Sequence, residues 1–190
     1  MKYYAGIGSR ETPEPIRKAM RSAAGAMAKA GVTLRTGGAK GADQAFFNGW
    51  QSVHGPIKVK EDFTVYFDEE PNLLELYLPY DGYNGFRYDG NTVFGPPTKE
   101  ARLLAKKYHP NWSGLGDRGR DFHARNCYQV LGFDLQTPSS FVLCWTEKGK
   151  PVGGTAQAIR IAEKHNIPVF NLGSTNLAEA SSKIMDIIND

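Results

Sequence analysis

The sequence of 190 residues is poor in the features that mark membrane, disulfide-rich and metal-binding proteins. It has no run of the roughly 20 apolar residues that a membrane-spanning helix needs, and its N-terminus does not have a signal-peptide pattern. Cys127 and Cys144 are the only cysteines, and they fit no metal-ligand spacing, so we expect two buried, reduced thiols. The four histidines are widely separated, which argues against a zinc site. We therefore expect a cytoplasmic protein without a metal or another cofactor.

Charge of one sign is also scarce, because 23 Lys and Arg residues face 20 Asp and Glu residues and give a net charge of +3. This balance permits an acidic ligand but falls short of the concentrated basic surface expected of a strong duplex-DNA binder. The apolar fraction of 41% is ordinary for a globular protein, and the length fits one domain. We expect residues 1–190 to form a single domain.

What the sequence does contain is three segments that pass from an apolar strand through a glycine turn into a helix. The turn residues that we predict to bind a ligand are Gly8, Ser9 and Arg10, then Gly37, Gly38, Lys40 and Asp43, and then Gly153, Gly154 and Thr155. Such turns should meet at the carboxyl edge of a parallel sheet, where helix N-termini favour phosphate and other anions. The alternative is that the glycines only form tight connections and that Asp43 caps its helix.

Strand and helix patterns alternate along the chain. Helices are predicted over 14–30, 42–54, 98–109, 121–131, 153–162 and 176–188. Strands are predicted at the start of the chain, before the glycine turn within 1–10, and near 31–35, 58–60, 63–67, 73–79, 140–145 and 167–172. This order predicts an α/β fold, a Rossmann-like three-layer α/β/α sandwich with a mainly parallel sheet. Residues 80–97, rich in glycine, tyrosine and asparagine, are expected to be a long ordered loop.

Two further groups of residues are candidates for ligand contacts. Arg125 and Asn126 lie in a helix that should pack on the sheet, so Arg125 needs an anionic partner. That partner is either a ligand phosphate or an internal carboxylate such as Asp121 or Asp134. The loop aromatics are either a lid that stacks on a base or an oligomer contact: Tyr80, Tyr83, Phe86 and Tyr88.

The segment Gly6-Ile7-Gly8-Ser9-Arg10 with Thr12-Pro13, the turn 37–43 and Arg125-Asn126 together resemble the Rossmann-like core of the DNA-processing protein A family. They also resemble the wider SLOG superfamily, which includes the "lonely guy" phosphoribohydrolases and nucleotide-sensing domains of bacterial immunity. The resemblance covers most of 1–50 and 121–190 and leaves about 55–120 as an insertion. Short members of this kind look similar to bacteriophage proteins, and the resemblance implies a homodimer or higher homo-oligomer.

The phosphoribohydrolases of that superfamily carry a glutamate three residues after a Gly-Thr turn. Gly154-Thr155 matches the turn and Arg125 matches the family's arginine, but the glutamate position holds Ala158, next to Gln157. Alanine cannot act as a general acid, so no catalytic residue is assigned and enzyme activity stays open.

Three functions remain as hypotheses. The favoured one is a protein that binds a nucleotide or nucleotide-derived signalling ligand, and senses or sequesters it. The second is a recombination mediator that binds single-stranded DNA. The third is a nucleoside-monophosphate N-glycosidase whose missing acid comes from Glu100, Asp117, Asp121 or Asp81.

Overall fold

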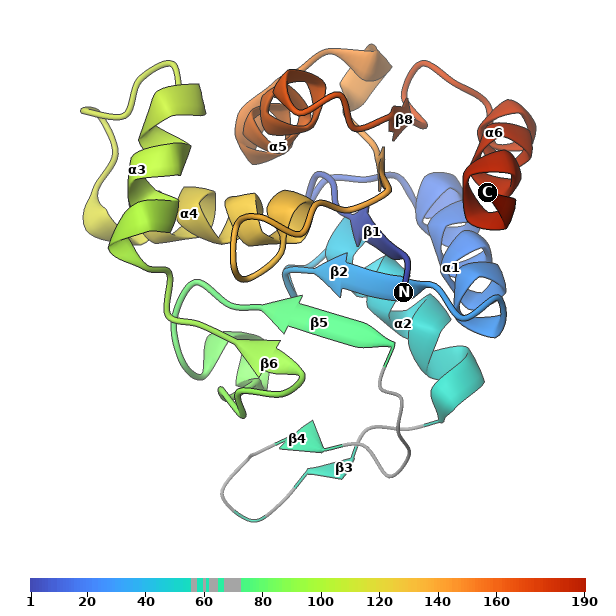
Figure 1. Ribbon diagram of the computed structural model, residues 1–190, viewed down its shortest axis with the longest axis horizontal. Coiled ribbons are helices and arrows are strands. Elements are labelled where there is room, and N and C mark those ends of the chain that lie inside the picture. Colours follow the sequence, from blue (N-terminus) through green and yellow to red (C-terminus); the bar gives the residue numbers. More distant parts are fainter. Residues whose placement is uncertain (56–57, 60, 62–64, 67–72) are drawn as a thin grey trace.

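The computed structural model describes residues 1–55, 58–59, 61, 65–66 and 73–190 and has a central sheet of parallel strands (Figure 1). The strands are β1 (Tyr3–Gly6), β2 (Thr33–Thr36), β5 (Leu74–Tyr77), β6 (Val93–Phe94), β7 (Phe141–Cys144) and β8 (Val169–Asn171). Their order is β6-β5-β2-β1-β7-β8, and every pairing is parallel. A separate antiparallel pair joins β3 (Lys58–Val59) to β4 (Val65–Tyr66). The predicted Rossmann-like α/β fold is confirmed.

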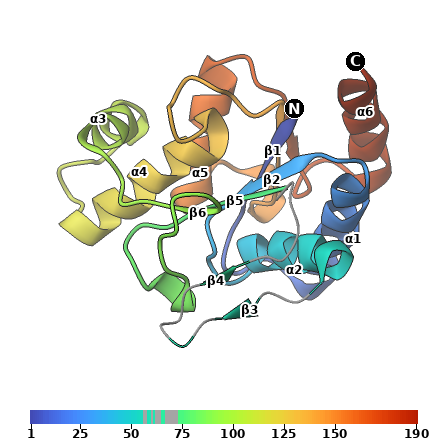
Figure 2. The same cartoon turned by 60° about the horizontal axis from the view of Figure 1, so that its bottom comes forward.

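Within the described part of the chain, six α-helices cover the two faces of this sheet (Figures 1 and 2). They are α1 (Glu14–Lys29), α2 (Ala42–His54), α3 (Lys99–Tyr108), α4 (Asp117–Leu131), α5 (Gly153–Lys164) and α6 (Leu177–Asn189). Successive strand residues point to opposite faces, so Tyr4 packs with α1, α2 and α6, whereas Ala5 packs with α3, α4 and α5. The result is one apolar core on each side of the sheet.

The order in which strands are added to the sheet reverses at β1. From β1 the chain proceeds through β2, β5 and β6 on one side, and β7 and β8 then add to the other side. Where the connections from two neighbouring parallel strands run to opposite sides of the sheet, a crevice opens at the carboxyl ends of those strands. The turns after β1, β2 and β7 therefore lie around one edge of the sheet.

The range 55–120, expected as an insertion, contributes to the main fold. Within it, β5 and β6 extend the sheet and α3 packs against α4. The loop prediction over 80–97 missed β6, whose Val93 is fully buried and pairs with Leu76. A strand of two residues is too short to show periodicity. Parts of the strands predicted over 58–60 and 63–67 lie outside the described residues.

Cys127 and Cys144 are free and buried, and burial raises the pKa of each thiol to about 12. Among the described residues no helix is long and apolar enough to cross a membrane. The same part of the chain contains no group of three or more metal-ligating side chains.

The contact between α1 and α2 depends on Gly49, because a Cβ there would overlap the carbonyl oxygen of Arg21. We expect Gly49→Ala to lower the free energy of unfolding by about 1–3 kcal/mol, although alanine favours a helix. Gly119→Ala is the matched control, since a Cβ in α4 makes only ordinary side-chain contacts. Urea denaturation of both variants tests this expectation, and equal stability of the two would contradict it.

Candidate functional site

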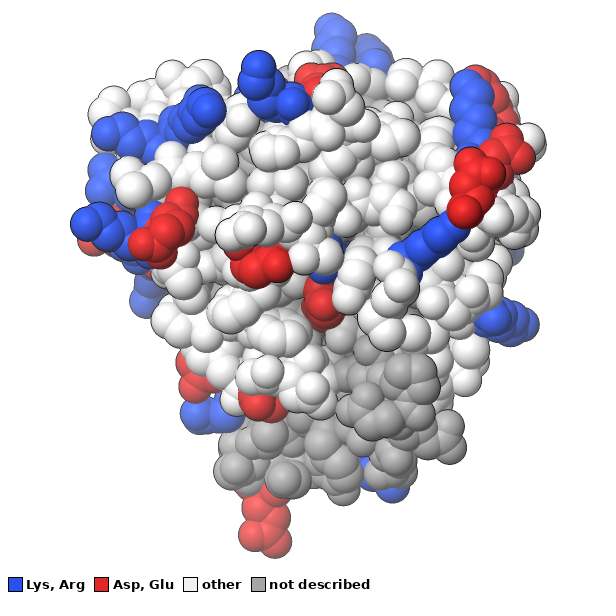
Figure 3. All heavy atoms as spheres, in the orientation of Figure 1, with Lys and Arg blue, Asp and Glu red and all other residues white. Residues whose placement is uncertain are grey.

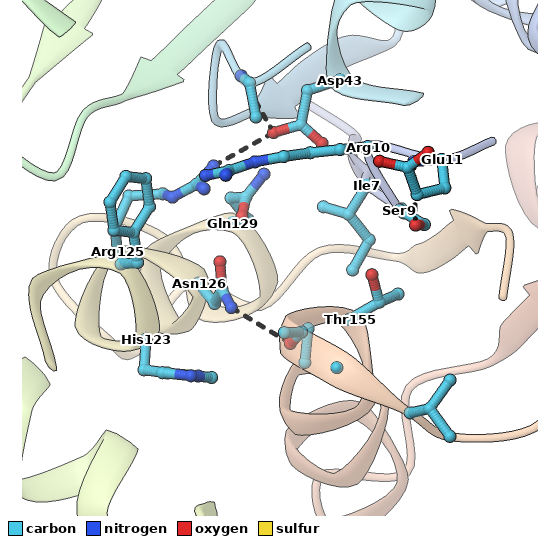
Figure 4. Close-up of a pocket in the computed structure, with 17 residues that line it drawn as sticks. Ile7, Ser9, Arg10, Glu11, Asp43, His123, Arg125, Asn126, Gln129 and Thr155 are labelled. Carbon is cyan, nitrogen blue, oxygen red and sulfur yellow. Dashed lines mark hydrogen bonds and ion pairs between the residues drawn. The ribbon is translucent and has the colours of Figure 1, made fainter. Parts of the chain in front are cut away.

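A cavity of about 370 Å³ lies at the carboxyl edge of the sheet, at the ends of β1 and β7 (Figure 4). Its lining comes from the first turn (Ile7, Gly8, Ser9, Arg10, Glu11), from Ala39 and Asp43, from α4 (Phe122, His123, Arg125, Asn126, Gln129) and from the third turn (Val152, Gly153, Gly154, Thr155, Ala158). The sheet thus brings together the first and third predicted turns and the predicted α4 residues. Gly37, Gly38 and Lys40 of the second turn lie outside the lining.

The first turn packs against the start of α2. The Ser9 carbonyl accepts hydrogen bonds from the backbone N–H groups of Thr12 and Ala42, both at 3.3 Å, and the Ser9 hydroxyl accepts one from the N–H of Glu11 at 3.0 Å. Ala42 therefore has no free N–H for a ligand. Arg10 is exposed and its guanidinium lies 5.4 Å from the ring centroid of Phe122.

The second turn has a structural role that the sequence did not reveal. A Cβ at Gly37 would overlap the Arg125 guanidinium, so glycine is needed where that side chain passes. The carbonyl of Gly38 accepts a hydrogen bond from Asn84 Nδ2 at 2.6 Å. Asp43 does not cap α2, whose N-cap is Gly41; its Oδ2 accepts a hydrogen bond from the N–H of Ala39 at 3.4 Å.

Asp43 is also the anionic partner of Arg125. Arg125 Nη1 lies 3.1 Å from Asp43 Oδ2, and the two side chains are only 6% and 4% exposed. Burial raises the pKa of Asp43, and the Arg125 guanidinium opposes that shift. The two carboxylates named as candidate partners do not pair with Arg125. Asp121 pairs with Arg102, and Asp134 accepts hydrogen bonds from backbone N–H groups of its own loop.

The third turn presents an open helix terminus. The N-cap Val152 supplies no side-chain hydrogen bond, and the first N–H groups of α5, at Gly153, Gly154 and Thr155, have no acceptor among the described residues. Asn126 Nδ2 donates to the Gly154 carbonyl at 3.2 Å and so ties this terminus to α4. Free N–H groups and the positive end of the helix dipole favour an anion here.

Two residues of α4 that line the cavity carry a buried donor without a protein acceptor among the described residues. Gln129 Nε2 and Arg125 Nε are unpaired within the described part of the chain, although these residues are 1% and 5% exposed. An unpaired buried donor costs about 1–3 kcal/mol, so a ligand with acceptor atoms would relieve that cost. Because both residues line the cavity, the orphan donors favour such a ligand in it.

The sequence reasoning did not assign Glu11, Phe122, His123 and Gln129 to the site, although they line it. Helical spacing would have found two of them, because Phe122, Arg125, Asn126 and Gln129 follow an i, i+3, i+4, i+7 pattern on one face of α4. His123 is three residues before Asn126 on the same helix, and Glu11 directly follows Arg10 in the first turn, so both lie next to predicted residues.

The predicted aromatic loop reaches the edge of this cavity. The rings of Tyr80 and Tyr83 make edge contacts with Phe122, at centroid distances of 6.3 and 5.3 Å. Tyr80 is 40% exposed, and the Arg118 guanidinium lies 5.8 Å from its centroid. The loop therefore adds an aromatic and cationic surface beside the cavity.

None of the four carboxylates considered for glycosidase chemistry lines the cavity. Asp81, Asp117 and Asp121 form ion pairs with arginines outside it, and Glu100 is in the first turn of α3. Ala158, at the position where the resembling hydrolases carry glutamate, does line it. Of the two carboxylates in the lining, Asp43 is paired with Arg125 and Glu11 is exposed.

The buried pair generates a stability prediction. Arg125→Met should lower the free energy of unfolding by about 3–5 kcal/mol, because it leaves Asp43 buried without its cation. Adding Asp43→Asn should recover part of that loss. The control is Lys183→Met, which breaks an exposed pair with Glu179 and should cost less than about 1 kcal/mol. Urea denaturation of Arg125→Met, of Asp43→Asn and of the double variant tests this coupling. It would be contradicted if the free energy lost in the double variant equalled the sum of the losses in the two single variants.

No protein-family model and no curated protein matches this chain. Among solved structures, the fold is similar to that of DNA processing protein A from Helicobacter pylori, in a structure that concerns the single-stranded DNA binding mode of that protein. The two chains are 17% identical, and the match covers 99% of this chain and 79% of the other with a TM-score of 0.52. The match supports the DNA-processing-protein-A-like fold that the sequence resemblance implied.

Proposed function

We propose that this protein binds a nucleotide-type ligand in the cavity, with a phosphate group at the N-terminus of α5. The observation that carries the proposal is the free N–H groups of Gly153, Gly154 and Thr155 beside a cavity that also holds two orphan buried donors. A phosphate offers several strong acceptor oxygens and negative charge, which match this set of donors.

Arg10 is the cation best suited to reach the ligand. It is exposed, it lines the cavity, and no carboxylate pairs with it among the described residues (Figure 4). Arg125, in contrast, already neutralises Asp43, so its Nη1 is committed to the protein, although its buried Nε has no partner among the described residues. We therefore expect Arg10 and the N-terminus of α5, rather than the Arg125–Asp43 pair, to neutralise the negative charge of the ligand.

The size and the aromatic edge of the cavity favour a nucleotide over inorganic phosphate. Its volume of about 370 Å³ lies within the range of roughly 300–1,000 Å³ that small-molecule sites occupy. Phe122 and the neighbouring Tyr80 offer faces and edges on which a base can stack, next to the guanidinium of Arg10. The absence of a carboxylate at position 158 favours retention of the ligand, for sensing or sequestration, over cleavage of its glycosidic bond.

Single-stranded DNA is the second candidate. It is favoured by the fold similarity to a protein studied for single-stranded DNA binding and by the exposed Tyr80 with Arg118 beside the cavity. On the face shown in Figure 3, however, Lys and Arg side chains are interspersed with Asp and Glu rather than gathered in one band. In this alternative the cavity would hold one nucleotide of the strand.

The test is binding of the four ribonucleoside 5′-monophosphates and their nucleosides, measured by isothermal titration calorimetry. Arg10→Ala should weaken monophosphate binding by about 10–100-fold, because it removes a charge-assisted hydrogen bond worth about 1.5–3 kcal/mol. It should change nucleoside binding little. Lys18→Ala, on the exposed face of α1, removes the same charge and should leave both affinities unchanged.

A ten-residue oligothymidylate distinguishes the second candidate. If the cavity is a mononucleotide site, a monophosphate binds without the oligonucleotide and is not displaced by it. If only the oligonucleotide binds, and Arg10→Ala weakens it, the protein is a single-strand binder. Equal loss of monophosphate and nucleoside binding in Arg10→Ala would contradict the phosphate assignment.

A further inference from the structure

His123 lies in the cavity at the end of a buried chain of side-chain amides. Its Nδ1 is 2.9 Å from Gln157 Oε1, and Asn126 Nδ2 donates to the same oxygen at 3.4 Å. Gln157 is fully buried, and its Nε2 donates to the Ala105 carbonyl at 3.2 Å. Since Asn126 also donates to the Gly154 carbonyl, one polar chain connects His123 with the N-terminus of α5.

This chain assigns the proton on the imidazole. Gln157 Nε2 must face Ala105, because only a donor can bond to a carbonyl, and this leaves Gln157 Oε1 to accept from His123. The proton of neutral His123 is therefore on Nδ1. Its Nε2 carries a lone pair and has no partner in the part of the chain that the structure describes.

A second histidine, which does not itself line the cavity, lies beside His123. The ring centroids of His109 and His123 are 4.2 Å apart, with the planes at 65°. His109 Nδ1 accepts a hydrogen bond from the N–H of Asn111 at 3.2 Å, so its own proton is on Nε2 when the ring is neutral. His109 is partly exposed and offers a route for proton exchange between His123 and water.

Three charged or titratable groups act on His123: His109 after α3, Arg160 on α5 and Arg125 on α4 itself. The cavity lining adds Asp43 on α2 and, in the turn after β1, Arg10 and Glu11. On the other elements that pack on α4, Arg35 on β2 pairs with Glu75 on β5, and Arg102 on α3 pairs with Asp121. Of these, His109, Arg125 and Arg160 disfavour a positive His123, and Asp43 is neutralised by Arg125. An anion in the cavity would reverse this balance.

We propose that His123 takes up a proton through Nε2 when a ligand with a terminal phosphate enters the cavity, and that the resulting imidazolium becomes a second cation of the binding site, beside Arg10. This inference rests on the proposed function, because it needs an anion at the α5 terminus. No covalent bond changes; the proton comes from water and stays on His123 until the ligand leaves.

The electrostatics of the empty site agree with this geometry. Burial lowers the pKa of His123 and the neighbouring cations lower it further, while the hydrogen bond to Gln157 opposes them. A bound phosphate would raise that pKa. Between the free and bound values the empty site is neutral and the occupied site is charged, so affinity should rise as the pH falls, by up to about tenfold per pH unit.

The first experiment counts protons with adenosine 5′-monophosphate as the probe. Calorimetric titrations at pH 6.5 in buffers of different ionisation enthalpy give the number of protons taken up per ligand bound. His123→Asn keeps a donor for Gln157 and removes the titrating nitrogen. Because the ligand's own phosphate titrates in both proteins, the difference between them reports His123, and we expect the wild type to take up close to one proton more.

The matched control is His165→Asn, an exposed histidine at the end of α5 and outside the cavity lining, which should keep the wild-type proton count. Equal counts in wild type and His123→Asn, with the ligand bound by both, would overturn the inference and leave the proposed function standing. If none of the four nucleoside monophosphates binds the wild type, both the proposed function and this inference are contradicted. Should His123→Asn not fold, the imidazole pKa of His123 measured by NMR decides, and a value unchanged by the ligand refutes the inference.

Discussion

The cavity depends on a buried ion pair between residues that are distant in sequence. Asp43, near the start of α2, and Arg125, in the middle of α4, join the helices that follow β2 and precede β7, on opposite faces of the sheet. The pair crosses the carboxyl edge of the sheet, and this crossing requires the absence of a side chain at Gly37. Because a buried arginine needs an anion within hydrogen-bond distance, the position and rotation of α4 follow from this contact.

Once α4 is fixed in this way, the rest of the site follows from helix geometry. Residues three and four positions from Arg125 share its face, so Phe122 and Gln129 line the same cavity. Asn126 on that face reaches the carbonyl of Gly154 and holds the start of α5 beside α4. The helix N-terminus therefore faces a cavity whose opposite wall is supplied by a single, rigidly held helix.

The sequence predicted the fold and much of the site because these depend on local patterns. Strand, glycine turn and helix recur at short range. Because the carboxyl ends of parallel strands lie at the same edge of the sheet, the first and third turns come together there. Of the two partners predicted for Arg125, a ligand phosphate or an internal carboxylate, the structure shows a carboxylate. It is Asp43 and neither of the two examples, Asp121 and Asp134, because Asp43 is 82 residues away and only the packing of α2 on the sheet brings it near. Gly37 looked like a ligand-binding glycine, but its conformational role is to leave room for a side chain from another helix. The same limit explains β6, since a pair of buried residues among turn residues has no detectable period.

Position 158, where the hydrolases that the sequence resembles carry a glutamate, is an alanine in the cavity lining, so any proton transfer in the cavity needs another group. Gln157, the nearest polar side chain in sequence, cannot take over, because an amide does not titrate; its Nε2 donates to the Ala105 carbonyl, and its Oε1 accepts from Asn126 and His123. The amide oxygen is instead a fixed acceptor that holds the proton of neutral His123 on Nδ1, so the basic nitrogen of the imidazole is Nε2. A site with a glutamate would add negative charge near a phosphate, whereas this site replaces it with a group that can become positive. That difference favours holding an anionic ligand over activating its glycosidic bond, and it ties the strength of that hold to pH.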